Sequence, residues 1–188
     1  VVIFSDEPGW HGKSLRREMA ELGLAASFVS LSHCALDMSG AHAAISIPGF
    51  STLPDAAFVR GVAGGSLEEI VLHLDILHAL EILGVPVFNN GRAIERTVDK
   101  GLTSFLLQHH NVPAARTWVL ESTAHARAIA ERELDGQRAL VLKPLFGSQG
   151  KGVIRISTLD EFDGYAPPAG VFYMQEYLKS NDGEFRDW

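Results

Sequence analysis

The segment at residues 139–157, ALVLKPLFGSQGKGVIRIS, constrains the possible fold more than any other part of this chain. It opens with an apolar run at 139–142 and closes with a run at 153–156 that alternates like a strand. Each run predicts a β-strand. The loop between them carries Gly147, Gly150 and Gly152. Because glycine has no Cβ, it adopts positive φ readily and lets backbone N–H groups approach an anion. The segment therefore predicts two strands joined by a loop that can hold a polyphosphate.

Two lysines bring positive charge to this loop, Lys143 at the end of the first strand and Lys151 within the loop. Ammonium groups neutralise phosphate oxygens. A Walker A loop requires four residues between its first glycine and the Gly-Lys pair, but only two residues separate Gly147 from Gly150. A dinucleotide-binding loop opens a helix, whereas a strand-like run follows here. A surface hairpin whose glycines only make the turn remains an alternative.

Composition narrows the class of protein. With 188 residues, 46% of them hydrophobic, the chain has room for one large or two small globular domains. The formal net charge of −7 argues against a partner that is a nucleic acid or an anionic membrane. Cys34 is the single cysteine, which suits the reducing cytoplasm. No apolar run reaches the length of a bilayer span and no leader is visible, but the chain starts at Val1, so the position of the native N-terminus stays open.

The first part of the chain alternates strands with helices, which predicts a parallel sheet covered by helices. Ser66 and Glu69 have the spacing of a capping box, and the helix they start shows an apolar stripe that includes Leu83 before Gly84 stops it. We place this first α/β domain at residues 1–92. Its predicted strands are at 1–4, 26–31, 43–47, 56–59 and 85–88, and its predicted helices are at 13–22 and 67–83.

The second part, residues 93–188, has an α+β pattern. A run at 172–178 taken alone is typical of an edge strand with polar residues facing water. His73 and His78 are five residues apart, which does not place two imidazoles on one helix face, so we predict no zinc site. The predicted elements are a helix around 102–109, a strand at 117–120, a helix at 123–134, the glycine-loop hairpin, a short helix capped by Thr158 and the 172–178 strand.

Three separated pieces, residues 89–100, 142–152 and 175–178, resemble in order the nucleotide-binding series of the ATP-grasp superfamily, and most of all RimK-like glutamate ligases. The resemblance covers residues 56–188 well and the opening residues only through their β–α pattern. It implies a pre-ATP-grasp domain followed by the N-terminal part of an ATP-grasp domain. It also leads us to expect that the chain stops before the half that binds metal.

The resemblance implies roles for individual residues. Lys100 and Lys143 would hold the ATP phosphates. Asp187 resembles the acidic residue near the ribose, although Glu184 lies close by. Arg60, at the end of a first-domain strand, is our candidate contact for a substrate carboxylate, because strand ends line the cleft of such sheets. The loop that would close over the phosphates consists of Phe146, Gly147, Ser148, Gln149, Gly150, Lys151 and Gly152. The hinge at the adenine edge would consist of Gln175, Glu176, Tyr177 and Leu178.

The activity that the resemblance implies is ATP-dependent ligation of an amine to a carboxylate through an acyl phosphate. The amine would be glutamate or another amino acid, and the acceptor a protein tail, a small peptide or the carboxylate tail of a cofactor. We expect Mg²⁺ ligands and the catalytic arginine beyond residue 188, no metal ligand within this chain, and no turnover by residues 1–188 alone. A homo-oligomer, a non-catalytic nucleotide-binding module and an interaction domain without a nucleotide site stay open.

Overall fold

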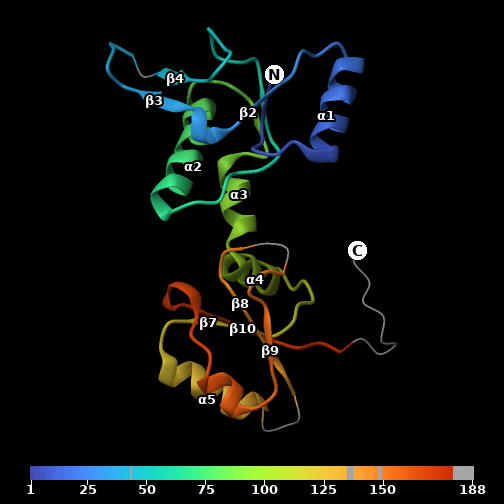
Figure 1. Ribbon diagram of the computed structural model, residues 1–188, viewed down its shortest axis with the longest axis vertical. Coiled ribbons are helices and arrows are strands. Elements are labelled where there is room, and N and C mark those ends of the chain that lie inside the picture. Colours follow the sequence, from blue (N-terminus) through green and yellow to red (C-terminus); the bar gives the residue numbers. More distant parts are fainter. Residues whose placement is uncertain (43, 135–137, 148–149, 180–188) are drawn as a thin grey trace. The chain divides into compact units, whose positions relative to one another are not determined.

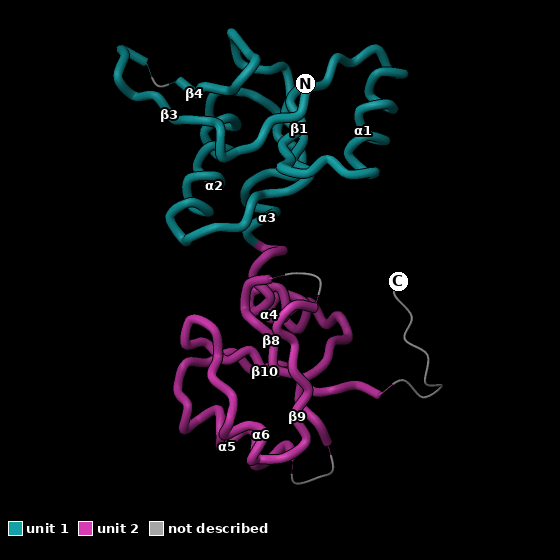
Figure 2. Tube along the Cα trace, in the orientation of Figure 1, with its two compact units in different colours: residues 1–95 teal, residues 96–188 magenta. Residues whose placement is uncertain are grey.

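The computed structural model describes residues 1–42, 44–134, 138–147 and 150–179 (Figure 1). The chain divides into two compact units, Val1–Glu95 and Arg96–Trp188 (Figure 2). Unit 1 holds a parallel sheet with helices, and unit 2 holds an antiparallel sheet with helices, so the predicted α/β class is confirmed. Among the described residues, no helix is both long and apolar enough to cross a membrane.

The main sheet of unit 1 has four parallel strands in the order β2-β1-β5-β6. The central strand β1 is VIF, and each of its three residues has no exposed surface. A fully apolar central strand is expected where helices cover both faces of a parallel sheet. The strands are β1 (Val2–Phe4), β2 (Ser27–Val29), β5 (Ala57–Val59) and β6 (Val87–Phe88).

Two helices, α1 (Gly9–Glu21) and α2 (Leu67–Ile82), lie on opposite faces of this sheet (Figure 1). Leu77 of α2 belongs to the same buried cluster as Phe4 of β1. On the other face, α1 approaches β2 closely, since a Cβ on Gly12 would lie 3.3 Å from the Phe28 ring. Ligands of open parallel sheets bind at the carboxyl ends of the strands, which here include the ends of β1 and β5.

The predicted capping box starts α2. The Ser66 hydroxyl accepts from the Glu69 N–H at 3.2 Å, and the Glu69 carboxylate accepts from the Ser66 N–H at 2.7 Å. Gly84, at φ +85°, follows the end of the helix as predicted. The buried stripe differs from the predicted one, because Leu83 is 39% exposed whereas His73 is buried. The buried face of α2 consists of His73, Ile76, Leu77 and Leu80.

Three local features of unit 1 differ from the prediction. The strand expected at 43–47, whose first residue lies outside the described part, does not join the parallel sheet. Instead β4 (Ala44–Ser46) pairs antiparallel with β3 (Ala35–Asp37), a strand that was not predicted. Helix α1 begins four residues earlier than expected. The expected strand end at residue 31 is instead part of a short 3-10 helix, η1 (Leu31–His33).

A further helix, α3 (Gly91–Val98), follows the Asn89-Asn90 turn and was also missed. Asn90 starts it, because the side-chain oxygen accepts from the Ala93 N–H at 2.9 Å. Asparagine followed by glycine is a turn signal, and this bond shows that the same asparagine serves as a helix cap.

The main sheet of unit 2 is antiparallel, in the order β7-β10-β8-β9. Strand β10 pairs with β7 on one side and with β8 on the other, so the edge-strand interpretation of residues 172–178 is wrong. Its polar residues, Gln175 and Glu176, sit in the middle of a sheet and take side-chain partners there. The strands are β7 (Thr117–Leu120), β8 (Leu140–Lys143), β9 (Ile154–Ile156) and β10 (Phe172–Glu176).

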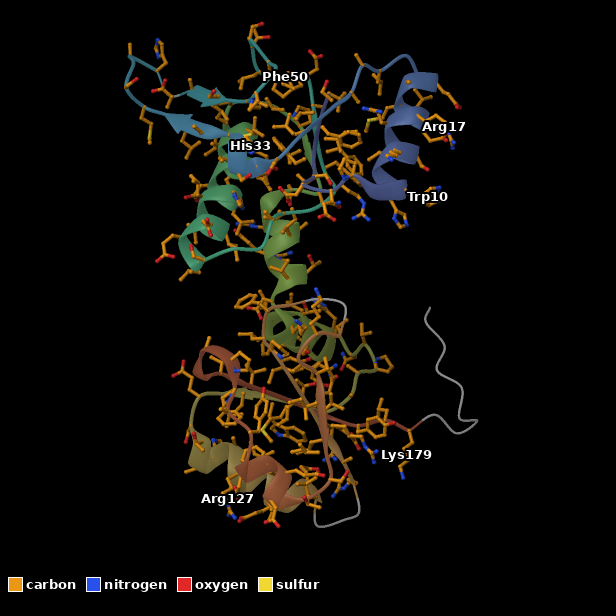
Figure 3. All side chains as sticks on the ribbon, viewed as in Figure 1. Trp10, Arg17, His33, Phe50, Arg127 and Lys179 are labelled. Carbon is orange, nitrogen blue, oxygen red and sulfur yellow. The ribbon has the colours of Figure 1, made fainter. Side chains whose placement is uncertain are left out.

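Helices α5 (Thr123–Leu134) and α6 (Leu159–Asp163) cover one face of this sheet. Ile129 of α5, Phe162 of α6 and Met174 of β10 lie in one buried cluster. Arg127 of α5, labelled in Figure 3, donates to Asp163 of α6 at 2.9 Å and joins the two helices. A short 3-10 helix, η2 (Pro168–Gly170), leads into β10, and α4 (Lys100–His109) belongs to the opposite face described below.

Replacing Ser66 with alanine removes the N-cap of α2. We expect the free energy of unfolding of unit 1 to fall by about 1 kcal/mol, the usual contribution of a Ser N-cap. A urea titration followed through the amide signals of α2 measures this. Ser51→Ala, at an exposed position in the same unit, is the matched control. Equal midpoints for the two variants would show that the capping box does not stabilise the helix.

Candidate functional site

The strands of unit 2 place a polar group of side chains on the face that α5 and α6 leave uncovered. Side chains alternate along β10, so Phe172 and Met174 enter the buried cluster while Tyr173 and Gln175 lie on the other face. Lys143 lies opposite Tyr173 in the register of β8 and β10 and therefore shares this face. Because successive side chains of a strand point to opposite faces, one face of the sheet is the apolar core and the other carries these polar side chains.

Hydrogen bonds join these polar side chains into one network. The Lys143 ammonium donates to the Gln175 carbonyl oxygen at 2.7 Å, and the Gln175 amide donates to the Thr117 hydroxyl at 2.9 Å. The Tyr173 hydroxyl lies 2.8 Å from the Ser104 hydroxyl of α4. The Lys143 ammonium is also 5.9 Å from the Tyr173 ring centroid. The half-buried lysine is thus held in place by neutral groups.

Lys100, the first residue of α4, reaches the glycine loop. Its ammonium donates to the Gly147 carbonyl at 2.7 Å and to the Leu145 carbonyl at 3.2 Å. The Asp99 carboxylate caps α4 by accepting from the Leu102 N–H at 3.0 Å. This cap fixes the start of the helix at Lys100. The structure therefore brings Lys100 to the loop that follows Lys143, 43 positions later in the sequence.

The two lysines also affect each other electrostatically. Burial lowers the pKa of Lys143, and the positive charge of Lys100 lowers the pKa further. Burial lowers the pKa of Lys100 as well. In the part of the chain that the structure describes, neither ammonium forms an ion pair with a carboxylate. Two neighbouring cations without an anionic partner are the charge pattern that a phosphate chain neutralises.

The loop has the backbone conformation that its glycines were expected to provide. Gly147, Gly150 and Gly152 have φ of +137°, +69° and +73°. Close packing adds to the requirement at Gly152, because a Cβ there would lie 2.9 Å from the Pro144 ring. Phe146 is 58% exposed and Lys151 is exposed, while Ser148 and Gln149 lie outside the described residues.

At the end of β10, an ion-pair network fixes the predicted hinge. Arg116 donates to Glu176 at 3.0 Å and to Glu133 at 2.8 Å, and Glu133 is only 3% exposed. The hydrogen bond from Arg116 is the main reason that the pKa of Glu176 is lowered. The backbone N–H groups of Glu176 and Tyr177 donate to the carbonyls of Arg116 and Ala139, both at 2.9 Å. These two N–H groups are therefore already bonded, while Leu178 is 61% exposed.

Sequence reasoning missed Arg116 and Glu133. A signal for Glu133 existed, because it stands four residues after Ile129 and three after Ala130, on the apolar face of α5. A carboxylate at such a position is buried and needs a cation. Arg132 and Arg138 also lie within 3.3 Å of this carboxylate.

A cavity of about 740 Å³ lies between α4 and β7. Its wall includes Asp99 and Gly101 next to Lys100, and Leu145 from the glycine loop. Thr117 of the polar network and Val119 line it as well. The cavity falls within the size range of small-molecule sites, roughly 300–1,000 Å³. Its walls come from the neighbours of Lys100 and Lys143 rather than from the two lysine side chains themselves.

The remaining predicted residues lie elsewhere. Arg60 follows β5 in unit 1, where its backbone N–H donates to the Phe4 carbonyl at 2.9 Å, and it lines a separate cavity of about 390 Å³. Asp187 and Glu184 lie outside the described residues. His78 lies 2.9 Å from Glu95, and over the described residues no group of three or more His, Cys, Asp or Glu side chains is placed to hold a metal ion.

No family model matches the sequence. Individual relatives do. Over 137 residues the chain is 36% identical to tetrahydromethanopterin:alpha-L-glutamate ligase of Methanococcus maripaludis, in a match that covers 70% of this chain and 44% of the relative. A probable alpha-L-glutamate ligase of Legionella pneumophila is 26% identical over 188 residues, covering 97% of this chain and 61% of the relative. The chain thus spans about half the length of the first of these relatives.

Among solved structures, the chain resembles a RimK domain ATP-grasp protein from Sphaerobacter thermophilus, with a TM-score of 0.69 and 20% sequence identity. The match covers 96% of this chain and 64% of that one. At this identity the likeness shows the fold. The chain thus has the fold of ATP-grasp proteins with a RimK domain, and its sequence is similar to alpha-L-glutamate ligases.

Proposed function

We propose that the protein to which this chain belongs is an ATP-dependent carboxylate–amine ligase. The observation that carries the proposal is the pair Lys100 and Lys143, which share one face of unit 2 and have no anionic partner among the described residues. The names of the ligase relatives support it. Residues 1–92 would serve as the pre-ATP-grasp domain and 93–188 as the N-terminal part of the ATP-grasp domain.

In this proposal the phosphates of ATP replace the present partners of the lysines. Lys143 would exchange the Gln175 carbonyl oxygen for phosphate oxygens, and Lys100 would exchange the carbonyls of Leu145 and Gly147. Both exchanges replace a neutral acceptor by an anionic one, so each ammonium gains a partner of opposite charge. Freed from Lys100, the loop that includes Phe146, Gly147, Ser148, Gln149, Gly150, Lys151 and Gly152 would bring its backbone N–H groups to the phosphates.

The hinge would hold the adenine. Because the N–H groups of Glu176 and Tyr177 are bonded within the sheet, their carbonyls and the N–H of Leu178 are the groups that we assign to the base. Gln175 would link this hinge to the phosphate end through its bond to Lys143. Asp187 remains our assignment near the ribose.

The reaction joins two anionic reactants. A carboxylate oxygen of the acceptor attacks the γ-phosphorus and ADP leaves; the amine nitrogen then attacks the acyl carbon, phosphate leaves and the nitrogen loses a proton. Lys100 and Lys143 lower the first barrier by neutralising and orienting the phosphates. Mg²⁺, when bound, would add positive charge that neutralises the phosphates further. We assign no Mg²⁺ ligand to the described residues of this chain.

The amine substrate in this proposal is glutamate or another amino acid, as the names of the relatives indicate. The acceptor is a carboxylate on a small molecule, a peptide or a cofactor tail, and tetrahydromethanopterin in one relative's name is an example of the last class. Arg60 is the proposed contact for a substrate carboxylate. We also propose a cytoplasmic location, which the single cysteine, Cys34, supports.

Replacing Lys143 with alanine tests the proposal. We expect the affinity of the chain for a non-hydrolysable ATP analogue to fall about 10- to 100-fold, because a hydrogen bond to a charged group contributes roughly 1.5–3 kcal/mol. Titration calorimetry measures the affinity. The control is Lys13→Ala, since Lys13 is an exposed lysine of unit 1. A Lys143→Ala chain that binds as tightly as the Lys13→Ala chain contradicts the proposed site.

The lowered pKa of Lys143 predicts a pH dependence of nucleotide binding. Phosphate binding needs the ammonium form of Lys143. The affinity should therefore be constant at pH values below the lowered pKa and should fall as the pH rises through that pKa. The fall should begin at a lower pH than the ordinary lysine pKa of 10.5 would give. In a Lys100→Met chain the neighbouring positive charge is gone, so the same fall should move to higher pH. Affinities measured from neutral pH upward give both curves. Curves that fall at the same pH would show that Lys100 does not act on Lys143.

A further inference from the structure

The carboxyl ends of β1 and β5 in unit 1 enclose the cavity of about 390 Å³, and the proposed nucleotide site makes no use of it. The segment that follows β1 contributes Ser5, Asp6 and Glu7. The segment that follows β5 contributes Arg60 and the small residues at 61–64. Ligands of open parallel sheets bind at this end of the strands. The volume is within the range of small-molecule sites, roughly 300–1,000 Å³.

One polar group in the cavity wall is free to bind a ligand. Ser5 is 8% exposed, and its hydroxyl forms no hydrogen bond with any described residue. A hydroxyl can both donate and accept a hydrogen bond. Ser5 is held by its backbone, whose N–H donates to the Val29 carbonyl at 3.0 Å. A ligand in the cavity would supply the hydrogen bond that the protein does not.

The charged groups of the cavity carry both signs. The Arg60 guanidinium forms no ion pair within the described part of the chain, and it is the cation of the cavity wall. Asp6 accepts a hydrogen bond from the Ser30 hydroxyl, which is itself 2.6 Å from the Ser32 hydroxyl. The Glu7 carboxylate takes no partner among the described residues. The wall thus offers a free carboxylate after β1 and a free guanidinium after the neighbouring strand β5.

This charge pattern selects the ligand. An inorganic phosphate or a nucleotide phosphate would face Asp6 and Glu7 as well as Arg60, and the two carboxylates would repel it. A simple amine would leave Arg60 unpaired. A molecule with one carboxylate and one ammonium satisfies both ends, because a guanidinium binds a carboxylate bidentately and a carboxylate accepts from an ammonium.

We propose that this cavity binds a zwitterionic α-amino acid, whose carboxylate pairs with Arg60 and the Ser5 hydroxyl and whose ammonium pairs with Glu7 and the free oxygen of Asp6. That this amino acid is the amine substrate of the ligase rests on the proposed function. The existence of the site rests on unit 1 alone.

The test uses the ¹⁵N-labelled 188-residue chain and two probes of similar length, L-glutamate and glutarate, which lacks the ammonium. We expect L-glutamate to shift the amide signals of Ser5, Gly61 and Gly64 in a saturable manner. Glutarate should bind about tenfold more weakly or not at all, because it cannot use Glu7. Equal shifts with the two probes would contradict a zwitterion site, and no shift of these amides with L-glutamate would contradict any amino-acid site.

Substitutions identify the groups that bind. Arg60→Gln and Glu7→Gln should each weaken L-glutamate binding about tenfold or more, since each removes one charged partner. Arg92→Gln and Asp75→Asn alter exposed charges of unit 1 outside the cavity and should leave the affinity unchanged. Unchanged affinity in Arg60→Gln, with a native amide spectrum, would overturn the assignment. Nucleotide binding through Lys143, measured on the same chain, fails or succeeds independently of this result.

Discussion

The alternation of side chains along two central strands of unit 2 is the constraint on which the proposed site depends. Strands β8 and β10 pair in a register that directs Leu140, Leu142, Phe172 and Met174 into the core under α5 and α6. The same register directs Lys143, Tyr173 and Gln175 to the other face. A shift by one residue would bury the lysine and expose the core, so the free energy of burying the apolar residues also fixes where the charge stands.

A positive site without an anion has to be stabilised by other means. Lys143 is held by the Gln175 amide oxygen, and Lys100 by two loop carbonyls, all of them neutral acceptors. Burial and mutual repulsion lower the pKa of Lys143, so the arrangement carries electrostatic strain that an anion would relieve. In contrast, the Glu176 carboxylate of the hinge has a charged partner, since Arg116 bridges Glu133 and Glu176. An anionic ligand would therefore gain more at the two lysines, which have only neutral acceptors, than at the hinge.

Much of this arrangement could be predicted from sequence. The positive φ of the loop glycines, the capping box of α2 and the parallel sheet of unit 1 each depend on local physical rules, and the structure confirms them. The failures have a shared cause. The central place of β10 and the pairing of β4 with β3 depend on contacts between distant segments, which polar residues in a short run do not reveal. The helix cap at Asn90 was missed because a helix cap and a turn use the same side-chain bond. Arg116 was missed because its partners, Glu133 and Glu176, are 17 and 60 residues away.

The most direct test of the central claim is a crystal structure of the chain bound to a non-hydrolysable ATP analogue. The account predicts that the triphosphate lies on the face of Lys143 and Tyr173, with the ammonium groups of Lys100 and Lys143 each within hydrogen-bonding distance, about 3 Å, of phosphate oxygens. It also predicts that the bonds from these lysines to Gln175 and to the loop carbonyls are broken or lengthened. A triphosphate bound elsewhere, with both lysines still bonded to their present partners, would contradict it.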